Sequence, residues 1–236
     1  MAVIEAYVTN LGKYNEGELA SALLKFPTTR EAVQEVLKQI GIDNIRYEEI
    51  FIADYDGDLS ELNACLGEYE SIDELNHLAC LLSELDKSDL EKFEAVVASG
   101  EHTSGAGDLI NLAENLDCYD FYIGVSDDET LGRIYAEDME MIDIPENLRN
   151  YFDYEAYGRD MRINEDGSFV KGGFLLPNGS QFIEYYRGRE DIPDEHKVSA
   201  YPQLSIREQM AAYKEVIDRF PQAAERPRPE QSHTDR

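Results

Sequence analysis

The segment DYDGD at residues 54–58 carries carboxylates at alternate positions, as a calcium-binding EF-hand loop does at its start. Such a loop also needs glycine at its sixth position and glutamate at its twelfth. Counted from Asp54, those positions hold Leu59 and Cys65. The segment is therefore more typical of an acidic turn between a strand and a helix, and only weak, adventitious cation binding stays open.

Other catalytic and metal-binding patterns fail as well. The histidines show neither H-E-x-x-H nor zinc-finger spacing, and the G-x-S-x-G motif of serine hydrolases does not occur. The two close glycines in segment 100–107 match neither phosphate-binding motif and predict a hinge or turn. Carboxylate pairs suited to glycoside hydrolysis could be drawn anywhere among 50 acidic residues, so that pattern is not specific. We expect no enzymatic activity, no cofactor and no metal.

Acidic residues are densest in the stretch 126–160, which has eleven acids and three arginines. Its apolar residues recur at the spacing i, i+3, i+4, once before Pro145 and once after it. The two sets are Leu131, Ile134 and Tyr135, and Leu148, Tyr151 and Phe152. This spacing predicts two helices that each bury one face, so that the carboxylates on the opposite faces are held in fixed positions. We expect a rigid folded body that displays an ordered array of negative charge.

Net charge is the unusual feature of the composition. The chain has 50 acidic and 21 basic residues, a net charge of −29. The net charges by segment are −6 for residues 1–60, −9 for 61–105, −12 for 106–190 and −2 for 191–236. Such a protein is attracted to basic surfaces and is not expected to bind nucleic acid or anionic membranes directly. The plain alternative is an acidic, well-solvated protein whose charge has no specific partner.

The three cysteines lie far apart and form no C-x-x-C pair, which predicts reduced thiols rather than disulfides. The first ten residues do not have the pattern of a signal peptide. No apolar run approaches the roughly 18 residues that a membrane helix needs. We therefore expect a cytoplasmic protein.

Residues 1–60 predict a small α+β domain, because strand-like runs flank one helix. The helix begins near Thr28, which forms a capping-box pattern with Glu31, and ends at Gly41. The flanking segments are strands at 2–9 and 47–53, and a strand or short helix at 19–26.

Residues 61–105 predict a helical middle domain. Ser71 with Glu74, and Ser88 with Glu91, repeat the capping-box pattern at the starts of two helices. Apolar residues at helical spacing follow each of them, so the two helices are expected to pack together.

Residues 106–190 predict a second α+β domain. A strand at 118–125 leads into the acidic stretch, and a turn at 164–167 follows it. The pair Asn178-Gly179 has the composition of a hairpin turn, with a last strand at 181–186.

The segment 191–236 predicts a linker, an amphipathic helix and a flexible tail. Ser205 and Glu208 form a capping box for a helix that reaches Phe220. Its apolar stripe is Ile206, Met210, Tyr213 and Ile217. The last sixteen residues are polar and rich in proline, which is typical of disorder.

Three blocks of the sequence resemble the ArdA family of antirestriction proteins. They are VIEAYVTNLGKYNEGEL at 3–19, NLRNYFDYEAYGRD at 147–160 and FIEYY at 182–186. The resemblance covers residues 1–190. It implies a non-catalytic protein of mobile genetic elements that mimics bent B-form DNA and occupies the DNA-binding site of type I restriction–modification enzymes. It also implies three small consecutive domains in an elongated, curved, acidic α+β body that forms a homodimer.

The resemblance further implies that acidic side chains stand in for DNA phosphates. By analogy these are Asp54, Asp56, Asp58, Glu70, Asp73, Glu74, Asp127, Asp128, Glu129, Glu137, Asp138 and Glu140. The dimer contact falls in the third domain, where apolar residues belong either to the core or to a dimer interface: Ile134, Tyr135, Met141, Ile142 and Ile144. The implied partner is the methyltransferase core of a type I enzyme. The alternative is an acidic module that sequesters another basic DNA-binding protein.

Overall fold

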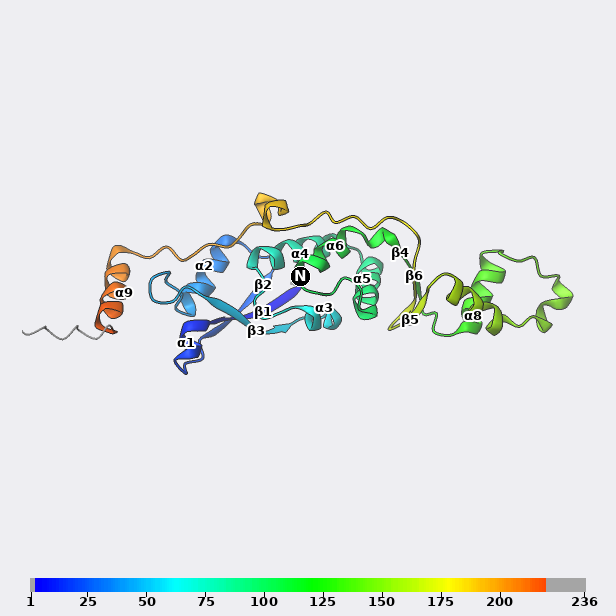
Figure 1. The fold of residues 1–236 in the computed structure, drawn as a ribbon, viewed down its shortest axis with the longest axis horizontal. Helices are drawn as coiled ribbons and strands as arrows, with labels where there is room; N and C mark the ends of the chain where they lie inside the picture. The colour runs from blue at the N-terminus through cyan, green and yellow to red at the C-terminus, as the bar shows by residue number, and fades with distance from the viewer. Residues whose placement is uncertain (1–2, 220–236) are drawn as a thin grey trace, which may run out of the picture.

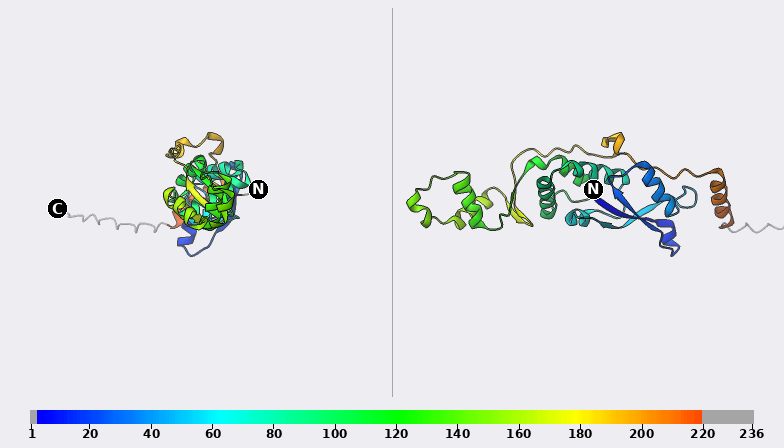
Figure 2. Two further views of the ribbon diagram at one scale, coloured as in Figure 1. Left: turned by 90° about the vertical axis from the view of Figure 1, so that its right-hand side faces the viewer. Right: turned by 180° about the vertical axis from the view of Figure 1, so that it is seen from behind.

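The computed structural model describes residues 3–219, which form an elongated body with small antiparallel sheets and packed helices. Figures 1 and 2 show an N-terminal sheet and a group of helices in the middle, α8 at one end and α9 at the other. The predicted α+β class is confirmed. Within the described part of the chain, no helix is both long and apolar enough to span a membrane.

The N-terminal sheet has the strand order β2-β1-β3, with both pairings antiparallel. Its strands are β1 (Ile4–Asn10), β2 (Ser21–Phe26) and β3 (Ile50–Asp56). The short helix α1 (Leu11–Asn15) follows β1, and α2 (Arg30–Gln39) follows β2. The strand predicted at 47–53 lies three residues further along the chain, as β3. The segment 19–26, for which a strand or a short helix was predicted, contains the strand β2. Thr29 rather than Thr28 caps α2, because its hydroxyl accepts the Ala32 amide at 3.3 Å.

Four helices form the middle of the body: α3 (Ser60–Cys65), α4 (Ile72–Glu84), α5 (Lys87–Ser99) and α6 (Ala106–Glu114). Asp86, not Ser88, caps α5, because its carboxylate accepts the Asp89 amide at 2.9 Å. The glycine-rich segment turns between α5 and α6, and α6 packs against α4. One hydrophobic core runs from Ile4 in the sheet to Val198 near the C-terminus. The exact division into domains stays a prediction.

The distal unit, residues 119–177, has a second sheet with the order β4-β6-β5. Its strands are β4 (Tyr119–Ile123), β5 (Ser168–Val170) and β6 (Gly173–Pro177). Two helices complete it: α7 (Asp128–Arg133), which continues as the π-helical turn η2 (Ile134–Asp138), and α8 (Tyr154–Asn164). A separate small core contains Leu131, Tyr135 and Phe174.

Glycines allow α7 and α8 to cross at backbone contact. A Cβ atom on Gly132 would lie 1.9 Å from the Tyr154 carbonyl oxygen, and one on Gly158 would lie 1.9 Å from that of Asp128. No side chain fits at either position. This close crossing fixes α8 against α7 and so determines the shape of the distal unit.

The second apolar stripe of the acidic stretch was predicted wrongly. Leu148 and Tyr151 lie in a 3₁₀ segment, η3 (Glu146–Tyr151), and are 50% and 85% exposed, and the half-buried Phe152 follows directly after it. The buried helix begins later, at Asp153, whose carboxylate accepts the Ala156 amide at 3.0 Å. Because the glycine crossing holds α8 against α7, the face of α7 is already occupied, and η3 remains at the surface.

The predicted strand at 181–186 was also wrong. The segment is extended but has no strand partner, because two asparagines of α6 satisfy its backbone. The Asn111 amide donates to the Tyr186 carbonyl oxygen at 2.8 Å and accepts the Tyr186 amide at 2.9 Å. Asn115 makes the same pair of bonds with Ile183, at 2.8 and 2.9 Å. The hairpin turn of the sheet lies at Gly172, and Asn178-Gly179 instead follows the end of β6.

Residues 178–205, here called the return strap, run back along the body from β6 to α9 (Ile206–Arg219) (Figure 1). The strap includes two single 3₁₀ turns, η4 (Arg189–Asp191) and η5 (Asp194–His196), and buries Ile192 and Val198 in the main core. The predicted capping box of α9 is present: the Glu208 carboxylate accepts the Ser205 amide at 2.8 Å. Phe220 and the predicted disordered tail lie outside the described residues.

Candidate acidic interaction surface

The acids of segment 54–58, at the end of β3 and in the turn after it, are exposed and free of basic partners within residues 3–219. Asp54 accepts only the amide of Tyr55, at 2.9 Å, and Asp56 only that of Gly57, at 2.8 Å. Asp58 is exposed as well. Both bonds leave the carboxylate charges uncompensated, so segment 54–58 displays three anions.

The acids at the start of α7 are partly committed to the fold. Asp127 caps the helix by accepting the Thr130 amide at 2.8 Å, and this bond lowers the pKa of Asp127 below its usual value. Asp128 accepts two bonds from the Arg162 guanidinium, at 2.8 and 3.2 Å. Glu129 pairs with Arg133 at 2.9 Å. Only part of this charge is available to a partner.

The π-helical turn after α7 places three exposed acids at the distal end of the body. Glu137 accepts a hydrogen bond from the Tyr154 hydroxyl. Asp138 and Glu140 are exposed and make no ion pair or side-chain hydrogen bond within residues 3–219. These acids, together with Asp54, Asp56 and Asp58, are the predicted residues that the structure leaves most available to a partner.

The acids at the start of α4 differ from the expectation. Asp73 is only 1% exposed and accepts the amides of Val198 and Ser199, both at 2.7 Å, and the Arg189 guanidinium at 2.8 Å. Burial by itself raises the pKa of Asp73, but these hydrogen bonds outweigh it and hold the pKa below its usual value. Asp73 therefore fastens the return strap and is not part of the surface.

Glu70 and Glu74 are half-buried and have structural partners too. Glu70 accepts the Ala106 amide at 3.3 Å, at the first residue of α6. This matters because Gly105, the residue before it, has no side chain to cap that helix. Glu74 accepts a hydrogen bond from the Tyr186 hydroxyl of the strap. Their charge contributes less to the exterior than the sequence suggested.

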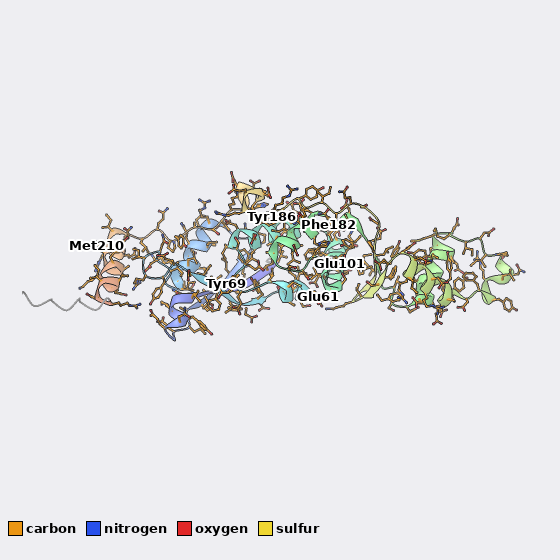
Figure 3. All side chains as sticks on the ribbon, viewed as in Figure 1. Glu61, Tyr69, Glu101, Phe182, Tyr186 and Met210 are labelled. Carbon is orange, nitrogen blue, oxygen red and sulfur yellow. The ribbon has the colours of Figure 1, made fainter. Side chains whose placement is uncertain are left out.

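Tyrosine hydroxyls hold many of the glutamates in place, a feature that the sequence analysis missed. Five pairs of this kind occur in the described residues: Tyr47–Glu16, Tyr119–Glu101, Tyr135–Glu165, Tyr154–Glu137 and Tyr186–Glu74. The Tyr119–Glu101 bond is 2.6 Å long, and Glu101 lies on the central part of the body in Figure 3. The pKa of Tyr119 is raised, first by burial and then by this bond, so the hydroxyl stays a donor at neutral pH. The sign of these pairs that the sequence offered was its composition, with 15 tyrosines and 50 acidic residues.

One acid of the central helices is partly buried. Burial raises the pKa of Glu94 on α5, and its Oε1 atom has no hydrogen-bond partner in the structure. The neighbouring Glu61 pairs with Lys171 at 3.2 Å. The Glu61–Lys171 pair compensates one negative charge of this central region.

The predicted interface residues separate into two groups. Tyr135 is buried in the small distal core, and Ile134 packs against it, which fits the core interpretation. Met141 and Ile142 are exposed at the far end of the distal unit. A hollow of about 330 Å³ there is lined by Ile142, Asp143, Ile144, Pro145, Leu148, Tyr151 and Phe152.

The arrangement is that of an elongated α+β protein in which amides, tyrosines and arginines hold some carboxylates in place and others are exposed without a basic partner in the described residues. Among residues 3–219, no group of three or more histidine, cysteine or carboxylate side chains could hold a metal ion. The protein is thus, by class, a folded polyanion without a metal centre in its described part. Its surface can bind a basic partner by charge.

The sequence model of the family described as "Antirestriction protein (ArdA)" matches residues 6–176, more than half of the chain. The chain belongs to the ArdA family of antirestriction proteins. Membership implies an antirestriction function and an interaction with restriction–modification enzymes, in a family that is not catalytic. A search of curated proteins found no match. The matched region ends before the return strap and α9.

Proposed function

We propose that the protein mimics B-form DNA and occupies the DNA-binding site of a type I restriction–modification enzyme. The observation that carries this proposal is the set of exposed carboxylates at Asp54, Asp56, Asp58, Asp138 and Glu140, which have no basic partner among residues 3–219. Because folded backbone holds these positions before binding, the array loses less conformational entropy on meeting a basic groove than a disordered acidic chain would. The groove would be the one that normally follows the phosphates of duplex DNA.

The magnitude of the charge supports this match. Duplex DNA carries roughly one negative charge per 1.7 Å of axis. Residues 1–190 carry a net −27, so two copies carry enough charge for about 90 Å of duplex on the same estimate. The pairs described above reduce the effective charge somewhat. A single copy would cover about half that length.

A homodimer would supply the second copy, and the exposed distal end is its proposed contact. Met141, Ile142 and Ile144 lie there beside the hollow, and burying them would remove apolar side chains from water. Ile142→Glu should shift the sedimentation coefficient of the protein to that of a monomer. An unchanged sedimentation coefficient would rule out this dimer contact and would leave the proposal of DNA mimicry unaffected.

The proposed activity can be tested with unmodified phage plated on hosts with and without a type I system. Expression of the protein should raise plating efficiency only where the restriction system is present. In vitro, its affinity for the purified methyltransferase core should fall steeply as salt rises, because binding releases counterions from both surfaces. A flat salt response would contradict the mimic mechanism.

The alternative partner is another basic DNA-binding protein, such as a histone-like protein or a regulator. The same acidic surface supports it, and competition with duplex DNA cannot separate the two. Assays with unrelated DNA-binding proteins can. Inhibition restricted to the restriction enzyme would favour the type I target, and inhibition of every basic protein tested would favour the alternative.

A further inference from the structure

The C-terminal helix α9 contacts the body through its polar face. Residues 208, 212, 215 and 219 lie on that face, and their partners are on the N-terminal unit. Glu208 pairs with Lys38 at 3.2 Å, Glu215 pairs with Arg46, and Arg219 pairs with Glu16 at 2.7 Å. Ala212 is buried between them. Ion pairs and one small side chain thus hold the helix in place.

The opposite face of α9 is apolar and exposed to solvent. It consists of Ile206, Met210, Tyr213 and Ile217, which are between 54% and 81% exposed. An amphipathic helix at a protein surface normally turns such a stripe toward the core. Helices α2 and α4 follow this rule, because they bury apolar residues in the core, whereas α9 exposes its apolar stripe. Figure 3 marks Met210 at the end of the molecule opposite the distal unit.

The spacing of the stripe defines what could cover it. The steps between its residues are four, three and four, the a/d pattern of a two-stranded coiled coil. The stripe is therefore a narrow seam that fits one partner helix. Helices that lie in a membrane surface have a wider apolar face.

Charge beside the seam selects among partner helices. In heptad terms Met210 and Ile217 are a positions, so Arg207 and Lys214 fall at the e positions and line one edge. The other edge, at the g positions, has Gln209 and Val216 and no charge. A partner helix with acidic flanking residues would form ion pairs along the basic edge, whereas one with basic flanks would be repelled.

A second copy of the chain fits this seam poorly. In an antiparallel pair the e positions face each other, so Arg207 of one helix would lie opposite Lys214 of the other. In a parallel pair Lys214 would face the uncharged Gln209, and two acidic N-terminal units would be brought together.

We infer that α9 is a docking helix for an amphipathic helix of a partner protein, one with an apolar a/d seam and acidic flanking residues. The pairing forms a short two-stranded coiled coil at the N-terminal end of the body. This contact does not depend on the acidic surface or on the proposed function. Screening limits the influence of the body's charge to about 8 Å at physiological salt, so the local charges of α9 decide the preference.

Two labelled probe peptides of three heptads test the inference with the full chain. Both have isoleucine at a and leucine at d; one has glutamate and the other lysine at every e and g position, so neither pairs with itself at neutral pH. Fluorescence anisotropy at about 0.15 M salt should show the glutamate peptide binding at least tenfold more tightly. Met210→Glu should reduce that binding at least tenfold, while the neighbouring control Ala211→Glu, on the edge away from the seam, should leave it unchanged.

A charge swap guards against an effect of misfolding. Arg207→Glu with Lys214→Glu keeps the seam apolar and should reverse the preference toward the lysine peptide. The inference is overturned if neither peptide binds, if Met210→Glu binds as well as the wild type, or if the swap leaves the preference as it was. It is equally overturned if Met210→Glu changes the sedimentation of the protein alone, which indicates a second copy. Met210-dependent binding to vesicles of phosphatidylglycerol and phosphatidylcholine would indicate a lipid surface instead.

Discussion

Helices α4 and α7 follow the same sequence pattern and use their acids in opposite ways. Each is preceded by a serine with a glutamate three residues later, Ser71 with Glu74 and Ser126 with Glu129. At α4 the acids face the return strap, and Asp73 is buried by it. At α7 the later helix α8 takes up only Asp128, through Arg162, and Asp127 and Glu129 stay at the surface.

The difference lies in what the rest of the chain does. An acid next to a returning backbone accepts its amides and stabilises the fold, whereas an acid that faces water keeps its charge for a partner. The local pattern of a helix start is the same in both cases. Surface charge therefore depends on long-range packing, and the two helices predict different outcomes for similar substitutions.

The largest effect on stability is expected for Asp73→Ala. The change leaves two strap amides and the Arg189 guanidinium without their acceptor, and should lower the free energy of unfolding by about 3 kcal/mol. Urea unfolding followed by circular dichroism measures this. The matched control Asp138→Ala should change stability by less than about 0.5 kcal/mol. Similar values for the two variants would remove the distinction between structural and surface acids.

The largest effect on function with little effect on stability is expected for the joint change of Asp54, Asp56 and Asp58 to lysine. It replaces three negative charges by three positive ones, a net change of +6, and should reduce inhibition of a type I enzyme at least tenfold, by phage plating and by affinity. The unfolding midpoint should stay close to that of the wild type, since these carboxylates accept only the amides next to them. Retained inhibition would show that segment 54–58 lies outside the contact.

An intermediate effect is expected from pH, and only at the strap. His77 on α4 is buried, and its Nδ1 lies 2.9 Å from that of His196 on the strap. Burial first, and the neighbouring His196 second, lower the pKa of His77. The folded state therefore favours neutral His77, while the unfolded chain binds a proton at about pH 6.5. Stability is full above that pH and falls as pH drops from about 6.5 toward the lowered pKa.

Hydrogen exchange at pH 7.5 and 5.5 would follow this loss. Amides near His196 and Val198 should exchange faster at the lower pH, after correction for the intrinsic rate. The distal unit, residues 119–177, contains no histidine and should change little. His77→Gln should remove most of the difference. An equal response of both regions would assign the pH effect to general acid destabilisation.

The elements whose stabilising contacts are local could be predicted from the sequence. The helix after Pro27, the turn at 164–167 and the capping box of α9 depend on nearby residues and are all present. The segment 181–186 has the composition of a strand, but its partners are Asn111 and Asn115, about 70 residues earlier. Composition cannot reveal a partner of that kind.

The candidate site divides in the same way. The exposed acids of residues 54–58 lie near a strand end, but β3 extends to Asp56, so Asp54 and Asp56 belong to the strand and only Asp58 to the predicted turn. Asp73, Glu70 and Glu74 looked similar, yet their partners come from the strap and α6. The tyrosine–glutamate pairs likewise join residues between 17 and 112 positions apart. Such pairs cannot be assigned without the fold.

The smallest effect is expected for Asp127→Lys. Asp127 is the N-cap of α7, so the change should cost about 1 kcal/mol of stability through the lost bond to the Thr130 amide and the positive charge at a helix start. Inhibition should fall by no more than about threefold, because many acids share the electrostatic contact. The control Asp127→Asn keeps the cap and removes one charge, and should leave both stability and inhibition near the wild-type values. Loss of inhibition in both variants would show that a single carboxylate at the start of α7 is essential for the function. The contrast with α4 would then be between one binding residue in α7 and one structural residue in α4.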